Sequence, residues 1–465
     1  MYWKLLPKIL TLTLVLLLTL PERLGKTITL TGASGFYFCK QTNEPTLLKS
    51  FLILVLLATV FYCCNTSVKE KSVPEDSLQY YPPTPAPISK DEFRQYYRQL
   101  SSFFDSTLLR YKNFNGQILI AKNGTILYEK YIGKRDLRKK DTMSSATSLH
   151  IASTSKTFTG VAILRLAQEG KLSLDDSLSR YFPELPYPGI TIKMLLNHRS
   201  GLPNYVHFMD RSGWNKKVYC TNPDVLQFMI NTPPNKEANP NRKFSYCNTN
   251  YLLLAMLIEK VTGKTYPEYL REKFFLPLQM KDSYVFTLKD TLTATPSFKA
   301  DGYIWTNDFL DGTYGDKNIY TTAGDLLKWD QALYTDQVIS KALLDSAFTS
   351  YSNERPSVHN YGLGFRLMNL PNNKKIVYHF GKWHGCNAAF ARLIDEKVTI
   401  IILGNRFTRS IYNTAHQSYD LFGEYFQKTS TEEEETDTLP SKKSARLKEK
   451  GAGSLPVKTE KKARR

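Results

Sequence analysis

The sequence lacks any apolar run of the roughly 20 residues that a helix needs to cross a membrane. Its two longest apolar runs, at 5–20 and 50–64, are shorter than that. Six cysteines are present, but no CxxC pair and no Cys and His spacing typical of zinc ligands, so no metal or other cofactor is expected. No repeat of 20–50 residues occurs, which excludes solenoid architectures. Basic runs with interleaved aromatic residues are absent from 90–427, so nucleic-acid binding is not expected although the formal net charge is +19.

The two apolar runs instead have the length of a signal-peptide core. The second run ends at Cys63 and Cys64, and a polar stretch, NTSVKEK, follows it. This pattern resembles a bacterial lipoprotein signal, in which the cysteine after the cleavage site carries lipid. We expect Cys64 to be the lipidated residue because a small residue then precedes it; an uncleaved membrane anchor is the alternative. Either interpretation predicts a membrane-associated protein of the cell envelope whose main domain lies outside the cytoplasm.

Changes in composition divide the chain into five parts. The first part, 1–46, is an extension with an apolar stretch, and a translation start near Leu47 is the alternative to a start at Met1. That start would need a codon other than AUG, because the next methionine is Met143. The other parts are a signal or anchor segment at 47–64, a Pro-rich linker at 65–89, a main domain at 90–427 and a disordered charged tail at 428–465.

Apolar periodicity and turn residues predict an α+β fold for the main domain. Ser89 begins a capping box that predicts a helix over 90–110, and Asn-Gly at 123–124 predicts a hairpin between two alternating strands. Further strands are predicted at 374–380, 387–394 and 397–403, before a last helix over 409–427. Helical patterns fill the region 150–345. We therefore expect an antiparallel sheet built from both chain ends and flanked by helices, with a mainly helical subdomain inserted.

Ser153 and Lys156 form the motif on which the functional prediction depends. The segment after them, TFTGVAILRLAQEG, has helical periodicity, so the two side chains share one face of the first turn. This end of a helix is electropositive, and burial there lowers the pKa of a lysine, which lets the amine act as a base. The alternative is an N-capping serine beside a solvated lysine, because Ser-x-x-Lys also occurs by chance.

Later segments give this motif its context. Ser153 lies in LHIASTSKTFTG, and the chain continues with ITIKMLLNHRSGLPNY, FSYCNTNYLLLAMLIEKVTG and YHFGKWHG. In this order the segments resemble the penicillin-binding-protein and class C beta-lactamase family, whose second and third motifs would be Tyr246-x-Asn248 and His379-x-Gly381. Arg199 departs from the threonine usual in that family. The resemblance covers about 93–427 and implies a beta-lactamase/transpeptidase-like fold and a serine hydrolase.

The resemblance also implies a role for each residue of the first two motifs. Ser153 would attack a carbonyl and form an acyl-enzyme, which water then hydrolyses. Lys156 and Tyr246 would share the transfer of the serine proton to the leaving group, as one coupled pair. Asn248 would bond both Lys156 and the acyl side chain of the substrate.

The third motif would complete an oxyanion hole and contact the substrate. Backbone N–H groups of Ser153 and Lys382 would stabilise the oxyanion, and Gly381 would leave room for a substrate along its strand. Many family members have lysine where this chain has His379. A histidine with a reference pKa near 6.5 is mostly neutral at pH 7. We therefore expect weak selection for a substrate carboxylate that improves toward pH 6, unless a nearby arginine supplies the charge.

Smaller roles are expected for other candidates. His198 is predicted to be a structural loop histidine, because the seven histidines show no ligand spacing. Cys247 is predicted to be a buried small residue. Trp383 and His384, which follow the third motif, would either line the mouth of the site or pack within a loop.

The sequence thus predicts a serine hydrolase of the esterase, D-peptidase or beta-lactamase type. Its substrate would be a small molecule or peptide with an ester or amide bond, including a lactam. A penicillin-binding sensor that is acylated without turnover is the alternative from another functional class, since one fold can host several activities.

Overall fold

The computed structural model describes residues 84–110 and 112–426. The predicted lipidation site at Cys64, both apolar runs, the charged tail and most of the linker lie outside the described residues. Within the described ranges, no helix is long and apolar enough to cross a membrane.

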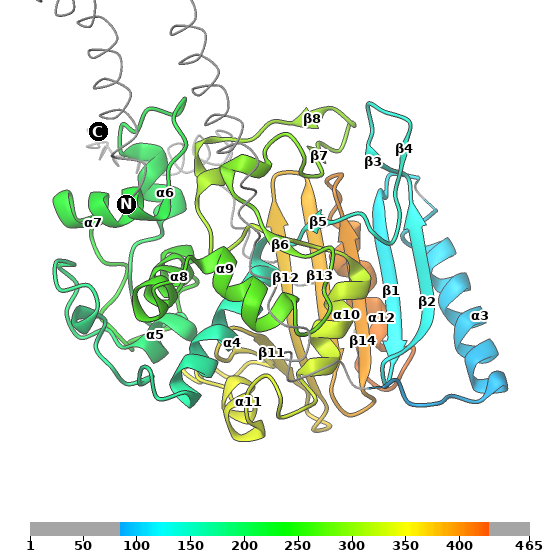
Figure 1. Ribbon diagram of the computed structural model, residues 1–465. Coiled ribbons are helices and arrows are strands. Elements are labelled where there is room, and N and C mark those ends of the chain that lie inside the picture. The colour runs from blue at the N-terminus through cyan, green and yellow to red at the C-terminus, as the bar shows by residue number, and fades with distance from the viewer. Residues whose placement is uncertain (1–83, 111, 427–465) are drawn as a thin grey trace, which may run out of the picture. The chain divides into compact units, whose positions relative to one another are not determined.

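An antiparallel sheet of seven strands forms the centre of the fold (Figure 1). In spatial order the strands are β10 (His359–Tyr361), β11 (Arg366–Asn369), β12 (Lys375–Trp383), β13 (Cys386–Leu393), β14 (Val398–Gly404), β1 (Gly116–Lys122) and β2 (Thr125–Ile132). Strand β1 pairs with β14 on one side and with β2 on the other, so the two ends of the domain build one sheet. The predicted α+β architecture is confirmed.

The sequences of the central strands explain their position. Strands β1 and β14 read GQILIAK and VTIIILG, and every residue in them except Lys122 is buried. Strands that are apolar on both faces need cover on both faces. The hairpin after β1 also follows from its sequence, because Asn123 and Gly124 have φ angles of 49° and 77°, the left-handed values of a two-residue turn.

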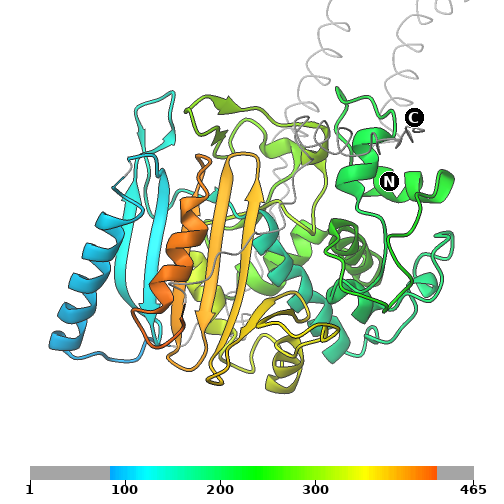
Figure 2. The same cartoon turned by 180° about the vertical axis from the view of Figure 1, so that it is seen from behind.

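Helices α3 (Lys90–Ser106) and α12 (Ser410–Tyr419) cover one face of the sheet (Figure 2). Ser89 caps α3 as predicted, with its Oγ accepting from Glu92 N at 3.2 Å. The last helix is shorter than the predicted 409–427. After Tyr419 the chain turns back, Tyr425 N donates to the Asp420 carboxylate at 3.0 Å, and the Tyr425 ring is buried in the core on this face.

The other face carries the mainly helical region. Helix α4 (Ser155–Gln168) packs against α8 (Asn248–Thr262) and is buried almost throughout. The further α-helices are α5 (Ile192–Leu196), α6 (Tyr205–Arg211), α7 (Asn222–Asn231), α9 (Tyr266–Leu270), α10 (Ala323–Ala332) and α11 (Lys341–Ala347). Because α4 lies between this region and the sheet, its N-terminal end is bordered by both.

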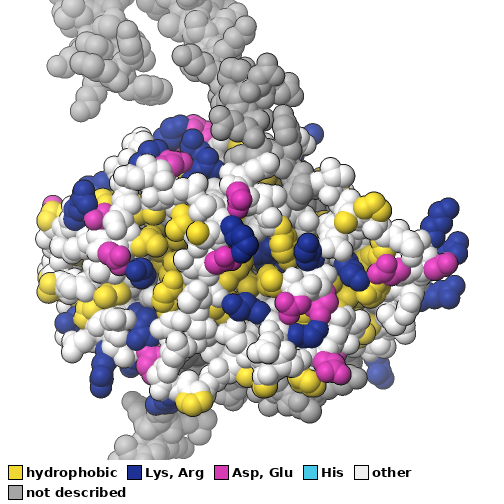
Figure 3. Space-filling model, turned by 90° about the horizontal axis from the view of Figure 1, so that it is seen from below, with side chains coloured by type: hydrophobic (Ala, Val, Ile, Leu, Met, Phe, Trp, Pro, Cys, Tyr) yellow, Lys and Arg dark blue, Asp and Glu magenta, His cyan; other side chains and the backbone are white. Residues whose placement is uncertain are grey.

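Besides the seven-stranded sheet, the described residues form three small sheets of short strands. A three-stranded sheet has the order β5 (Leu149–His150), β9 (Ile319–Thr321) and β6 (Tyr284–Val285). Two small hairpins pair β3 (Lys134–Asp136) with β4 (Asp141–Thr142) and β7 (Ser297–Phe298) with β8 (Ile304–Trp305). Basic and acidic side chains are interspersed on the face seen from below (Figure 3), in keeping with their scattered positions in the sequence.

Candidate active site

Ser153 lies in a 3-10 turn, Ala152–Thr154, between strand β5 and helix α4. The turn runs directly into α4, so Ser153 precedes the helix rather than lying in its first α-helical turn. Its side chain is buried, with 5% of the residue exposed. Ala152 has a φ of 47°, a left-handed value that is uncommon for a residue with a Cβ. A sharp turn therefore presents the serine at the electropositive end of a buried helix.

Lys156 is fully buried in the first turn of α4, and its Nζ lies 2.9 Å from Ser153 Oγ. The spacing of the two residues predicted this contact. Nζ also donates to the backbone carbonyl of Asp316 at 3.0 Å. The Asp316 carboxylate accepts from the Tyr205 hydroxyl at 2.9 Å, which fixes the segment that holds this carbonyl. No sequence pattern indicates this second partner, because it lies 160 residues away in the chain.

Tyr246 reaches the same place from the segment before α8. Its ring centroid lies 4.9 Å from Lys156 Nζ. His198 packs on this ring with centroids 4.4 Å apart, and its Nδ1 accepts from Cys247 N at 3.1 Å. His198 is fully buried and Cys247 nearly so, and burial raises the pKa of the Cys247 thiol to about 11. Both residues therefore have the structural roles predicted for them, and they hold Tyr246 beside the lysine.

Asn248 is the first residue of α8 and is 2% exposed. Its Oδ1 is buried and has no hydrogen-bond partner among the described residues. Buried polar atoms without a partner are uncommon in folded proteins. The predicted bond from Lys156 to Asn248 is therefore not formed, and the site contains a buried acceptor that is open to a donor.

The structure gives Gly381 a steric role besides the predicted one of leaving room for a substrate. A Cβ at this position would lie 2.3 Å from the Ile151 carbonyl oxygen and 2.9 Å from Ser153 N. The serine turn thus packs directly on β12, and Thr154 Oγ1 also donates to the His379 carbonyl at 3.1 Å. Strand β11 pairs with β12 only as far as Tyr378. Beyond Tyr378, β12 runs past the backbone N–H of Ser153, which is the first predicted oxyanion donor. The second predicted donor, Lys382 N, lies on this part of β12.

His379 is placed differently from the prediction. Its ring is fully buried, with Nε2 3.0 Å from the Tyr361 hydroxyl and Nδ1 2.8 Å from the Phe380 carbonyl oxygen. Burial holds the pKa of His379 well below its usual value, and the charges of Arg366 and Lys156 lower it further. This lowered pKa argues against the predicted gain in carboxylate selection toward pH 6, which required His379 to gain a proton there.

Arg366 is a cation near the site that belongs to none of the three sequence motifs. It begins strand β11, and its Cζ lies 5.0 Å from the Tyr246 ring centroid. It also lines a cavity of about 440 Å³ together with Lys243 and Arg355. No sequence motif marks Arg366, and only the fold brings it to Tyr246, 120 positions earlier in the chain.

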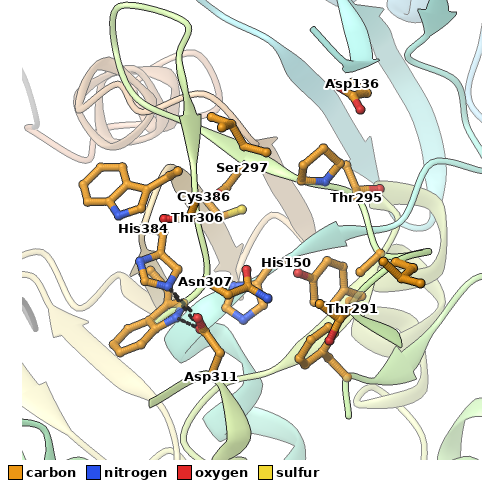
Figure 4. A pocket seen from close by; sticks show the side chains of 18 of the residues that line it. Asp136, His150, Thr291, Thr295, Ser297, Thr306, Asn307, Asp311, His384 and Cys386 are labelled. Carbon is orange, nitrogen blue, oxygen red and sulfur yellow. Dashed lines mark hydrogen bonds and ion pairs between the residues drawn. The ribbon is translucent and has the colours of Figure 1, made fainter. Parts of the chain in front are cut away.

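A second cavity, of about 420 Å³, lies past the end of β12 (Figure 4). Trp383 and His384 line it, which places both at a cavity rather than in a closed loop. Trp383 Nε1 donates to Asp311 Oδ1 at 2.6 Å, and His384 Nε2 lies 2.9 Å from Asp311 Oδ2. Burial opposes charge on His384, but the bond to Asp311 raises its pKa above the usual value. Asp308, Asp311 and His384 form the one group in the described ranges that could hold a metal ion, but hydrogen-bond donors already occupy the Asp311 carboxylate.

Comparison with known proteins agrees with this geometry. A sequence model of the Beta-lactamase family matches residues 96–420. Penicillin-binding protein 4* of Bacillus subtilis (strain 168) is 33% identical over 335 residues, which span 68% of this chain and 74% of that protein. The crystal structure of a penicillin-binding protein from Bacillus halodurans has a TM-score of 0.61 at 24% identity, covering 70% of this chain and 99% of that one. A D-amino acid amidase from Ochrobactrum anthropi SV3 has a TM-score of 0.55 at 23% identity, covering 66% and 91%. The chain therefore belongs to the beta-lactamase family of serine acyl-enzyme hydrolases.

Proposed function

We propose that this protein hydrolyses an ester or amide through an acyl-enzyme on Ser153. The observation that carries the proposal is the 2.9 Å contact between Ser153 Oγ and the fully buried amine of Lys156. A serine hydroxyl is a weak nucleophile until an adjacent base removes its proton. The serine is also presented at a helix N-terminus, where negative charge that develops in the reaction is stabilised.

The chemical steps follow from the arrangement of the side chains. Ser153 Oγ attacks the carbonyl carbon while its proton passes to the pair formed by Lys156 and Tyr246. The oxyanion accepts hydrogen bonds from the backbone N–H groups of Ser153 and Lys382. The pair then returns the proton to the leaving group, and the carbonyl re-forms as the acyl-enzyme. Water attacks this ester in the reverse sequence, and Asn248 Oδ1 accepts from an N–H of the acyl side chain.

We propose amides, peptides or esters of D-amino acids as the substrate class. The names of the similar proteins, a penicillin-binding protein and a D-amino acid amidase, favour this class. The cation Arg366 beside Tyr246 favours substrates with a carboxylate near the scissile bond, because a guanidinium binds a carboxylate with two parallel hydrogen bonds.

The experiment that tests the function is a substrate panel on the purified chain. It compares a D-amino acid amide, a peptide ending in two D-residues, a neutral aryl ester and a chromogenic cephalosporin, with Ser153→Ala as the control. Continued product release from at least one of them, absent in Ser153→Ala, supports the proposal. A single stoichiometric burst with every compound would instead establish the acylated sensor as the function.

Arg366 rather than His379 is expected to select a substrate carboxylate. Arg366→Gln should lower kcat/KM for the cephalosporin about 10-fold or more, on the scale of a lost charged hydrogen bond, and change the neutral ester little. In the wild-type protein, the ratio of kcat/KM for the cephalosporin to kcat/KM for the neutral ester should stay constant between pH 6 and pH 8. Arginine keeps its charge over this range, and the pKa of His379 is lowered away from it.

The matched control for Arg366 is Arg355→Gln, a cation of the same cavity. It should leave the ratio unchanged. An equal loss on both substrates in Arg366→Gln would show that this arginine supports the site without reading the carboxylate. His379→Lys is not expected to favour lactams, because it would place a second charge in a buried site near Arg366.

We also propose that the catalytic domain lies outside the cytoplasm, tethered through a lipid on Cys64. The lipoprotein-like pattern at 50–64 supports this location. Mass spectrometry of the mature protein from a membrane fraction should find a lipidated N-terminal cysteine at position 64. Recovery of a soluble cytoplasmic product that retains residue 1 would contradict the proposal.

A further inference from the structure

The backbone N–H of Ala152, the residue before Ser153, is held by a side chain that the mechanism does not use. It donates to Nδ1 of His150 at 3.2 Å, and both residues are buried. Ala152 has the left-handed φ of 47°. A residue with a Cβ keeps such a conformation only where its surroundings impose it.

The tautomer of His150 follows from its neighbours. Asn318 Nδ2 donates to the Asp311 carbonyl at 2.8 Å, which turns Asn318 Oδ1 toward His150 Nε2, 3.0 Å away. Because Oδ1 can only accept, Nε2 must carry the proton. Nδ1 of the neutral ring is then a bare acceptor, as the Ala152 N–H requires. The chain of bonds runs from the floor of the 420 Å³ cavity, which His150 and Asn318 line (Figure 4), to the residue before Ser153.

We propose that His150 is a positioning residue for Ser153, acting through its hydrogen bond to Ala152. The inference rests on the proposed function, since it assigns a supporting residue to the same site. Without this acceptor, the buried N–H of Ala152 loses its partner and the strained turn is free to relax. Relaxation would move Ser153 N relative to β12, against which the turn is packed at Gly381.

The electrostatic surroundings preserve the required tautomer. Burial lowers the pKa of His150 to about 4, against an opposing effect of the bond to Asn318. The charged groups that act on the ring are Asp311, His384 and Lys317, and the ring of Tyr320 packs edge-on with centroids 5.0 Å apart. His150 is therefore neutral at the pH where a serine hydrolase of this type would be assayed, and Nδ1 stays an acceptor.

Two substitutions in the full chain distinguish the hydrogen bond that His150 makes to Ala152 from the packing of the His150 side chain. The amide oxygen of His150→Asn lies near the place of Nδ1 and can still accept from Ala152, whereas the longer amide of His150→Gln reaches the place of Nε2. We expect His150→Asn to keep kcat within about 3-fold of wild type. His150→Gln should lose about 10-fold or more in kcat with less than about 3-fold change in KM, and its rate of labelling by a fluorophosphonate should fall in parallel.

A third substitution tests whether relaxation of the strained turn at Ala152 causes the loss of kcat. Glycine adopts a φ of 47° without strain, so Ala152→Gly combined with His150→Gln should recover at least about 3-fold of the lost kcat. This recovery also distinguishes the effect from misfolding of His150→Gln, which the glycine would not repair. Equal kcat losses in the Asn and Gln variants, or wild-type kcat in both, would overturn the proposal. Failure of the proposed function itself is a separate outcome, visible as Ser153→Ala labelling like wild type.

Discussion

Ser153→Ala is expected to abolish turnover of every substrate and all labelling by a fluorophosphonate or a penicillin. Removing the nucleophile of a serine hydrolase costs roughly 10⁴–10⁶ in kcat, because the acyl-enzyme cannot form. Here the loss should be complete within detection, because Ser153 Oγ is the hydroxyl that lies 2.9 Å from Lys156 Nζ and its removal leaves no oxygen to form the acyl-enzyme. Gel fluorescence after probe labelling and steady-state rates measure the two effects.

The control for this prediction is Ser155→Ala, two residues along the same turn. Ser155 Oγ accepts from Ile319 N at 3.1 Å and so has a structural partner. This variant should still be labelled at Ser153. Full activity in Ser153→Ala, or a label that maps to another residue, would remove Ser153 from the mechanism.

Lys156→Met and Tyr246→Phe should each lower kcat by roughly 10²–10⁴-fold, the scale of general acid–base catalysis. Methionine fills the space of the buried lysine stem but cannot accept the serine proton. The Lys156 amine lies 4.9 Å from the Tyr246 ring centroid, close enough for the two groups to act as one unit in the proton transfer. We therefore expect the double variant to be little slower than the slower single variant.

Single-turnover acylation rates and thermal unfolding midpoints distinguish chemistry from stability in this series. All three variants should unfold cooperatively, with acylation slowed far more than any shift in midpoint explains. Losses that multiply in the double variant would indicate that the two residues act independently and that the coupled pair is the wrong description.

Features encoded over short distances were predictable. The Asn-Gly turn at 123–124, the apolar strands of the sheet and the Ser-x-x-Lys spacing each depend on neighbours within a few residues. The 409–427 helix was predicted too long because its periodicity does not reveal that Tyr425 turns back to bury its ring. The motif also could not reveal the state of His379, whose pKa is lowered first by burial in the fold and then by the charges of Arg366 and Lys156.

Contacts that join distant segments were the ones that sequence patterns could not give. The three-stranded sheet of β5, β9 and β6 consists of strands of two or three residues, too short for any periodicity. That small sheet brings His150 to Asn318, 168 residues away, and so creates the support beneath Ala152. A motif locates the reacting groups, but the fold supplies the residues that hold them.

The pairing of β1 with β14 has a consequence for biosynthesis. Gly116 pairs with Gly404, so the central sheet joins the first strand of the domain to its last. Closing so long a loop is slow, because the entropy cost is met before the contacts form. A ribosome must therefore deliver residues up to 404 before the central sheet can be completed, so this sheet forms only after almost the whole domain has been synthesised.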